Sequence, residues 1–579
     1  MKRGFRVAEA PPAAQGPSVP VAQTDLAQRA TRVAGVRLEW RAAAEMPADL
    51  PWEQGAEEPE VGDPDARKGG RVRLSNVGPY PAHFLAFGSA QPQFFHYSLF
   101  TTVELPLVAY HPLNGHPIPA VAEAWAVQGR TLWFRLNPAA RYSNGQPVRA
   151  GDYVLGALLR AEVGGAEHEA LCAAAESVCA YGDAVVAVTL RQNAVSTAAA
   201  AALLHAAEPT FYAEFGADYR ERYAQRVPPT TGAYTVGRRE RGRMVELVRV
   251  KNWWARDLRY YRYTCNVDAV EHHFLTDEAQ AWEFFLRGRL DLLQTRNMQA
   301  WQERLRTADA RIQRRVFEAE YPLPPYGIAL NTQTLPNADL RRGLLCAMDM
   351  DRAVAVLFRG EQGRLTTFSS GYGALTPADT PQDRYDPAAA RAAFARAGYT
   401  RAGEDGILQR EDGTRLSVHL LFTPNDKTET LAGILCSSAR RCGAEILPEP
   451  LPWQTVDRRQ REGSHELLFW ADVAAAPLPQ YERWFGAAAA ASPFRLQSPA
   501  MEQALAQYRA AATQEERAAA VAAVDRCVYT AACWLPGWRE SRAHVAYWPR
   551  LRFPNVPTCR FSAPAPYDVA EAHLYWVED

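Results

Sequence analysis

The stretch RVPPTTGAYTVGRRERGRMVELVRVKNWWARDL, residues Arg226–Leu258, carries most of the structural information in this chain. It opens with a prolyl turn and a Thr-Gly-Ala-Tyr corner, continues as two alternating strand patterns and closes on Asn252-Trp253-Trp254. Alternation of apolar and polar residues favours strands with one buried face. We expect both tryptophans to be structural, because large aromatic side chains most often pack in cores.

Length and charge limit the classes of protein to consider. At 579 residues the chain exceeds the size of one hydrophobic core, so we expect two to four domains. Lys and Arg total 64 against 65 Asp and Glu, which leaves no global charge favouring nucleic acid or an anionic membrane. The longest apolar run, residues 194–207, contains Ser196, Thr197 and His205 and is shorter than a membrane span. We expect no transmembrane helix.

The N-terminal residues MKRGFRVAEAPPAAQGPSVPVAQ have a basic start but no apolar core of a secretory signal. The Pro- and Ala-rich stretch Ala8–Gln23 is typical of a flexible spacer behind a cleaved signal or a lipid anchor. We therefore expect that an export signal has been removed.

The cysteines offer no metal or redox motif. No two form a C-x-x-C, which leaves zinc ribbons and thioredoxin-type sites unsupported. Local disulfides within the three close pairs stay open as an alternative, and buried thiols acting as small hydrophobes are our preferred interpretation. The nine are Cys172, Cys179, Cys265, Cys346, Cys436, Cys442, Cys527, Cys533 and Cys559.

Further motifs follow in order along the chain. A Lys68-Gly69-Gly70 turn precedes an alternating strand, residues 131–136 alternate again, and Asn144-Gly145 predicts a hairpin turn before a helix. Residues 326–332 read as a strand. Asp386 and Pro387 predict the start of a helix with Gly398 just past its end. Its apolar stripe is Ala390, Ala393, Phe394 and Ala397.

Together these motifs resemble family 5 of the extracellular solute-binding proteins, the peptide-capturing subunits of ABC importers, from about Lys68 to Trp538. The "YDPAAARAAFARAGY" segment, residues 385–399, is almost the family pattern. The W-x-x-D-L motif at residues 254–258 resembles that of the subgroup associated with longer peptides and peptide-nucleotide antibiotics. The resemblance implies an α/β fold: a two-lobed type II periplasmic-binding-protein fold with an extra inserted domain and a ligand cleft between the lobes.

The resemblance also implies domain boundaries. Residues 1–67 would be a partly flexible N-terminal extension. Lobe I would take residues 68–105, 210–321 and 536–579, the inserted domain 106–209, and lobe II 322–535. The Pro-rich segment Tyr321–Pro325 fits a crossover between the lobes, because prolines stiffen a connection.

Candidate ligand-binding residues follow from the same resemblance. Asp472 matches an Asp that pairs with a peptide's α-amino group in relatives; the alternative is an Asp that caps a turn at a strand end. Trp453 matches an aromatic pocket position, against the alternative of a core tryptophan. We add as candidates Phe469, Trp470, Tyr326 and Tyr97, and expect at least two of Phe94, Phe95 and Tyr97 to lie in the core.

Other sites find less support. His272 and His273 are adjacent on an expected strand and point to opposite faces, so they cannot chelate one metal together. His465-Glu466 lacks the second histidine of a zinc protease motif, and no nucleophile elbow, phosphate loop or dinucleotide motif is present. We expect neither enzyme activity nor cofactor nor metal.

The expected function is the capture of a peptide-like ligand and its delivery to the ABC permease subunits, by a monomer in the periplasm or anchored outside the membrane by a lipid. Neither nucleic acid nor a membrane is expected as a direct partner. Two alternatives stay open: the same fold carrying a metal chelate, sugar or opine, and a ligand-sensing domain. The chemical identity of the bound ligand would distinguish a non-peptide carrier from a peptide carrier. A DNA-binding segment in the chain would favour the ligand-sensing domain.

Overall fold

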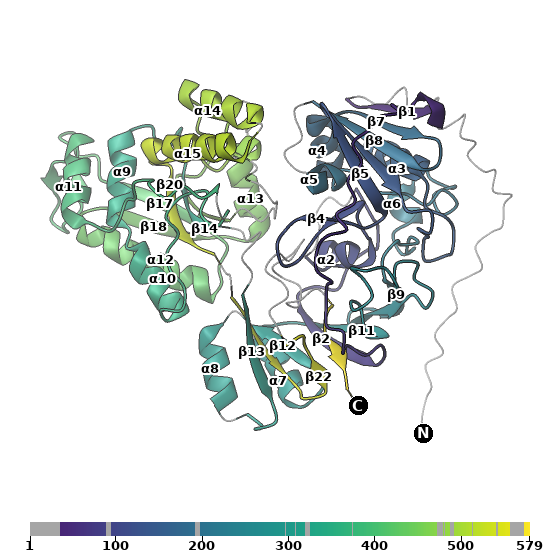
Figure 1. Ribbon diagram of the computed structural model, residues 1–579. Coiled ribbons are helices and arrows are strands. Elements are labelled where there is room, and N and C mark those ends of the chain that lie inside the picture. The colour runs from purple at the N-terminus through teal and green to yellow at the C-terminus, as the bar shows by residue number, and fades with distance from the viewer. Residues whose placement is uncertain are drawn as a thin grey trace.

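The computed structural model describes residues 35–88, 94–191, 197–295, 297–306, 308–318, 325–372, 375–471, 479, 481–486, 491–511, 513–539, 542–555 and 573–578. Figure 1 shows two bodies joined by a narrow waist of crossing chain. One body holds lobe I and the inserted domain, and the other is lobe II.

Lobe I contains a four-stranded sheet in the order β2-β11-β10-β9. Its strands are β2 (Arg71–Val77), β9 (Tyr234–Glu240), β10 (Met244–Arg249) and β11 (Ala269–Leu275). The two alternating patterns of the opening stretch are therefore confirmed as the antiparallel pair β9 and β10. One face of this sheet packs on α2 (Phe94–Val103) through Val72, Val245 and Val270. A single helical turn, α6 (Tyr219–Arg222), precedes β9 in the sequence.

A second sheet of lobe I has the order β12-β21-β13. It comprises β12 (Leu292–Thr295), β13 (Gln313–Glu318) and β21 (Arg542–Tyr547), and its strands are antiparallel. The helices α7 (Glu278–Leu286) and α8 (Met298–Arg306) flank it. A short pair, β22 (Leu551–Arg552) with β23 (Trp576–Val577), lies beyond.

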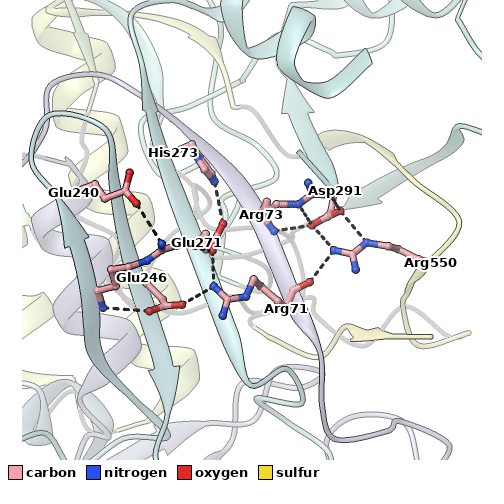
Figure 2. A network of polar contacts seen from close by, with 9 residues as sticks. Arg71, Arg73, Glu240, Glu246, Glu271, His273, Asp291 and Arg550 are labelled. Atoms are coloured by element: carbon pink, nitrogen blue, oxygen red, sulfur yellow. Dashed lines mark hydrogen bonds and ion pairs between the residues drawn. The ribbon is translucent and has the colours of Figure 1, made fainter. Parts of the chain in front are cut away.

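A polar network joins the two sheets of lobe I (Figure 2). The carboxylate of Asp291, just before β12, accepts hydrogen bonds from the Arg73 side chain at 2.7 and 3.0 Å and from Arg550 Nε at 2.9 Å. Burial alone would raise the pKa of Asp291, but the bonds from Arg73 and Arg550 outweigh it and the pKa is lowered. On the same face, Glu271 accepts from Arg71, and from Arg238 and His273 at 3.2 Å each.

The inserted domain is built on a five-stranded sheet in the order β1-β7-β8-β6-β5. Its strands are β1 (Arg37–Arg41), β5 (Ala122–Gln128), β6 (Thr131–Leu136), β7 (Ala175–Tyr181) and β8 (Val185–Leu190). The helices are α3 (Ala150–Val163), α4 (Ala166–Ala174) and α5 (Thr197–Ala201), with a hairpin of β3 (Val108–Tyr110) and β4 (Pro117–Pro119) and a turn η1 (Ala43–Glu45). The predicted Asn144-Gly145 turn is present, since Gly145 has a φ of 84°.

Strand β1 comes from the region expected to be an N-terminal extension. It pairs in parallel with β7, from Arg37 opposite Ser177 to Arg41 opposite Tyr181. Further along, Glu53 bridges to Trp125, Gly62 bridges to Tyr263, and Lys68 donates to Thr264 and Asn266. Residues 35–68 thus run as a strap from the inserted domain to lobe I.

Lobe II has a five-stranded sheet in the order β18-β17-β19-β14-β20. Helices α9–α12 cover one face and α13–α15 the other. The strands are β14 (Tyr326–Leu330), β17 (Ser417–Phe422), β18 (Glu445–Pro450), β19 (Leu467–Ala471) and β20 (Trp534–Trp538). The helices are α9 (Ala338–Ala347), α10 (Met350–Phe358), α11 (Pro387–Arg396), α12 (Asp426–Arg441), α13 (Trp453–Glu462), α14 (Pro499–Ala510) and α15 (Gln514–Ala531); β15 (Arg401–Ala402), β16 (Leu408–Gln409) and η3 (Tyr481–Arg483) are minor elements.

The helix α11 confirms the capping prediction. The Asp386 side chain accepts from the backbone N–H groups of Ala388 and Ala389, and Pro387 is the first helical residue. Gly398 has a φ of 93°, a conformation that glycine adopts without strain. All four residues of the predicted stripe are buried, and Ala390, Phe394 and Ala397 belong to the lobe II core.

The chain passes twice between lobe I and lobe II. One crossing lies between the end of β13 at Glu318 and the start of β14 at Tyr326, and the other between the end of β20 at Trp538 and the start of β21 at Arg542. The proline-rich segment predicted as a crossover falls mostly outside the described residues. The expected domain boundaries stay a prediction, because sheets show which strands belong together and not where a domain begins.

Of the nine cysteines, the eight in the described part of the chain are free thiols, and Cys179, Cys346, Cys442 and Cys533 are buried. No helix in the described ranges is both long and apolar enough to cross a bilayer.

Candidate functional site

One edge of the lobe II sheet gathers most of the predicted site residues. Strands β17, β18 and β19 are mutually parallel and end there at Phe422, Pro450 and Ala471. Strand β14 is antiparallel to β19, so Tyr326 begins opposite Ala471, and on its other side Tyr326 pairs with Trp538 at the end of β20. We call this the crossing edge, because both crossings reach lobe II here. In open α/β sheets, ligands bind outside the carboxyl ends of the strands.

Three aromatic rings meet at the crossing edge. The Tyr326 ring lies 5.5 Å from that of Trp538 at an interplanar angle of 7°, and 6.1 Å from that of Phe469 at 19°. Phe469 and Trp538 are 5.7 Å apart at 25°. Trp538 is only 1% exposed, whereas Tyr326 and Phe469 are half-buried. The half-buried rings present an apolar surface backed by a rigid stack.

Trp470 lies on the opposite face of the sheet from Phe469, as adjacent residues of a strand must. It is 6% exposed and makes edge-to-face contacts with Trp484 at 4.8 Å and Phe494 at 5.2 Å. The two predicted candidates therefore do not share one surface, and the structure places Trp470 in the aromatic core under α13–α15.

Trp453 is the first residue of α13, just beyond the end of β18. Its exposed fraction of 56% is the highest among the exposed large apolar residues of the described ranges. The alternative of a core tryptophan is therefore wrong. Figure 1 shows α13 on the side of lobe II that faces lobe I and the inserted domain.

Two of the predicted site residues are not placed. Asp472 lies outside the described residues, directly after Ala471 at the crossing edge. Tyr97 belongs to α2, but its side chain is outside the described part, as is that of Phe94. Phe95 is 3% exposed and packs on Phe274, as expected of a core residue. The roles assigned to Asp472 and Tyr97 stay predictions.

The Trp253-Trp254 pair has the structural role that the sequence predicts. Both indole N–H groups donate to the backbone oxygen of Thr231, at 3.0 and 3.1 Å. The pair thus ties the end of the opening stretch to its Thr-Gly corner. His272 is buried and the neighbouring His273 is half-buried. The expected alternation of burial is nevertheless wrong for this strand, because Glu271 and Leu275, on the same face as His273, are buried as well. Within the described ranges no cluster of three or more His, Cys, Asp or Glu residues is arranged to hold a metal.

Sequence reasoning missed a buried polar group beside the crossing edge. Arg539, the residue after β20, is 7% exposed and its guanidinium lies 5.6 Å from the Tyr372 ring centroid. It occupies the space next to Gly371, where an added Cβ would come within 1.2 Å of Arg539 Nη1 and φ is 87°. The Ser-Ser-Gly-Tyr run at 369–372 was the available signal, since such a glycine marks a close approach.

Asp525 of α15 holds the loop that contains Gly371. Its carboxylate, 2% exposed, accepts from Ser369 Oγ at 2.7 Å and from Ser369 N at 3.3 Å. Ser369 also hydrogen-bonds the Tyr481 hydroxyl. Burial raises the pKa of Asp525 to about 6, although the bonds from Ser369 and Thr367 act in the opposite direction. The network thus ties the loop around Ser369 and the short turn η3, through Tyr481, to helix α15.

Two lobes of mixed α/β structure, joined by two crossings that meet an aromatic sheet edge, define the class of two-lobed periplasmic binding proteins. The family model for bacterial extracellular solute-binding proteins, family 5 Middle, matches residues 116–491. The chain belongs to this family, whose members serve ABC importers.

Individual relatives agree with this assignment. A Brucella melitensis protein described as a binding protein is 22% identical over 497 residues, which cover 77% of this chain and 80% of that protein. YejA of Escherichia coli is 25% identical over 250 residues, 42% of this chain and 39% of YejA.

Solved structures share the fold. The oligopeptide-binding protein AppA of Bacillus subtilis, with a nonapeptide, has a TM-score of 0.72 at 14% identity and covers 89% of this chain and 100% of its own. NikA of Brucella suis, solved with Fe(III)-EDTA, has a TM-score of 0.69 at 19% identity, and the match covers 84% of this chain and 97% of NikA. AgaA of Agrobacterium tumefaciens, solved with agropinic acid, has a TM-score of 0.68 at 15% identity, and the match covers 88% of this chain and 99% of AgaA.

Proposed function

We propose that this family 5 protein captures a peptide-like ligand at the crossing edge, closes its lobes around it and delivers it to the permease of an ABC importer. The carrying observation is that apolar side chains are exposed at the carboxyl ends of the lobe II strands, beside both crossings: the half-buried rings of Tyr326 and Phe469 on the sheet face that α9–α12 cover, and the exposed Trp453 at the start of α13, which packs on the other face. Apolar walls of this kind accept side chains of varied sequence.

The ligand's main chain would supply most of the affinity. An extended peptide can pair with main-chain groups, so recognition does not depend on its side chains. Asp472 follows directly on the crossing edge, where a carboxylate can pair with the peptide's α-amino group. AppA was solved with a nonapeptide, and a Pseudomonas aeruginosa relative, 26% identical over 216 residues, carries the name of a di/tripeptide-binding protein. Both support a peptide ligand.

A second candidate keeps the fold and changes the cargo. The structures of NikA and AgaA contain Fe(III)-EDTA and agropinic acid, so this fold accommodates small non-peptide ligands as well. Under either candidate we propose a monomeric carrier outside the cytoplasm without catalytic activity, because no described side chain at the crossing edge is a nucleophile paired with a base.

Mass spectrometry of small molecules released on denaturation of the purified protein tests this proposal. A ladder of short peptides would support the peptide ligand and reveal its preferred length. A single non-peptide mass would replace the cargo and keep the carrier. If nothing is released, thermal-shift screening with peptides and metal chelates decides between the two, since a bound ligand raises the unfolding temperature.

A further inference from the structure

The two crossings divide the interface of lobe I and lobe II into two sides. Figure 1 shows α13 and the inserted domain on one side of the crossings, and α8 and α10 together on the other. Between the described residues of α13 and those of the inserted domain the structure has no hydrogen bond or ion pair, and Trp453 of α13 is exposed. Among the described residues, α13 and the inserted domain are thus not held together by polar contacts on the first side.

On the second side the lobes touch through the end of α10. This helix ends at Phe358, and the next residue, Arg359, takes a left-handed conformation with a φ of 50°. The Arg359 guanidinium donates to Gln302 Oε1 of α8 at 2.5 Å. The contact joins the last turn of a lobe II helix to a helix of lobe I.

Glu361 completes this contact. Its carboxylate lies 3.2 Å from His544 Nε2 of β21, and its backbone oxygen accepts from Arg542 Nη1 at 3.2 Å. The His544 side chain is 7% exposed and its ring packs against Trp301 of α8 at 5.3 Å. We call the contact of Arg359 and Glu361 with Gln302, Arg542 and His544 the back contact.

The position of the back contact determines what it does during closure. Arg542 is the first described residue after the second crossing, so the contact begins within a few residues of the hinge. A rotation about the crossings that brings α13 toward the inserted domain moves the end of α10 away from α8 and β21, because these lie on opposite sides of the axis. Closure therefore breaks the back contact.

We propose that the back contact is a latch that stabilises the open form and thereby lowers ligand affinity. This inference rests on the lobe closure of the proposed function. A ligand that binds the closed form must overcome whatever free energy favours the open form, so weakening the latch raises apparent affinity without touching the ligand site.

The test uses three full-length proteins besides the wild type. The Gln302→Ala, Glu361→Ala double variant removes the side-chain partners of Arg359 and His544 and leaves only the hydrogen bond from Arg542 to the Glu361 backbone oxygen. The Gln302→Trp variant wedges the end of α10 away from α8. The matched control, Asp339→Ala, breaks an exposed ion pair to Arg396, 2.8 Å long, that lies wholly within lobe II. Circular dichroism checks that each variant folds.

Small-angle X-ray scattering of ligand-free protein measures the open–closed balance independently of any cargo. We expect a smaller radius of gyration for both latch variants and no change for the control. Titration with the peptide trialanine should show affinity raised roughly fivefold or more. An unchanged radius in both latch variants overturns the latch. If the radius shrinks but trialanine binds to no protein, the latch stands and the peptide ligand is what fails.

Discussion

Tyr326 and Trp538 stack their rings 5.5 Å apart and nearly parallel, and each is the lobe II residue at which one crossing arrives or departs. The stack therefore fixes the spacing of the two crossings at their lobe II ends. Closure must occur in the chain beyond these rings and not within the sheet, because a packed aromatic core resists deformation.

Replacing Trp538 by Ala should destabilise lobe II by about 3–5 kcal/mol, because a side chain that is 1% exposed would leave a large cavity. Urea unfolding followed by circular dichroism measures this. Trp538→Phe is the control and should cost clearly less, since the indole N–H has no hydrogen-bond partner within the described residues. Equal losses in the two variants would contradict the packing role.

Trp453→Ala should leave stability within about 0.5 kcal/mol of wild type, because the side chain is 56% exposed. Under the proposed function ligand affinity should fall, since the proposal assigns the exposed indole to an apolar wall that contacts the cargo. Isothermal titration with the ligand identified by mass spectrometry provides the measurement. Trp470→Ala is the matched control, which should unfold at lower urea because this ring is core.

Under the proposed function Asp472→Ala should weaken peptide binding at least about tenfold, because the α-amino group of the bound peptide would lose the carboxylate with which it pairs. Asp457→Ala, on α13, removes a carboxylate that pairs with Arg461 and serves as the control. N-terminal acetylation of the peptide should remove the difference between wild type and the Asp472 variant. Unchanged affinity in Asp472→Ala would reject its anchoring role.

Asp291→Ala should cost roughly 1.5–3 kcal/mol, because it removes the buried carboxylate that accepts hydrogen bonds from Arg73 and Arg550, whose partly exposed guanidinium groups can turn to water. The lowered pKa of Asp291 also sets the direction of a pH effect. Its stabilising contribution is present above the unfolded pKa and is lost as pH falls through the folded value. Denaturant titrations at neutral and acidic pH should show that the difference in free energy of unfolding between wild type and Asp291→Ala is smaller in acid.

The carboxyl of Asp525 predicts the opposite pH trend. Its folded pKa of about 6 exceeds the unfolded value of about 3.9, so the folded state binds the proton more tightly. Its contribution to stability therefore decreases as pH rises from about 4 to about 6. Asp525→Asn cannot ionise and should lose this dependence, which unfolding midpoints measured across that range would reveal. Parallel pH profiles for both proteins would contradict the assignment.

Local signals predicted much of the fold. Glycine, asparagine and proline placed the turn before β2, the Asn144-Gly145 turn and the start of α11, because those conformations demand few residue types. Period-two patterns placed β9 and β10. The strap could not be predicted, because pairing of β1 with β7 joins residues about 140 positions apart and leaves no local pattern.

The site was predicted less completely. The sequence proposed Phe469, Tyr326 and Asp472 as parts of one site. The sheet register places Phe469, Tyr326 and Ala471, the residue before Asp472, at the crossing edge. Sequence reasoning grouped Trp470 with them, since a run of aromatic residues on a buried strand does not reveal which face carries the core. The back contact escaped notice because Glu361 and His544 are ordinary polar residues whose meaning lies in their position across a hinge.

The strand order of lobe I has a consequence for how the protein is made. Strand β21 is the central strand of the sheet β12-β21-β13, and it leaves the ribosome only after all of lobe II has been synthesised. Until then β12 and β13 have no strand between them, and their free edges are open to wrong partners. Lobe II, by contrast, is formed from one uninterrupted segment. The nascent chain therefore completes its second lobe before its first.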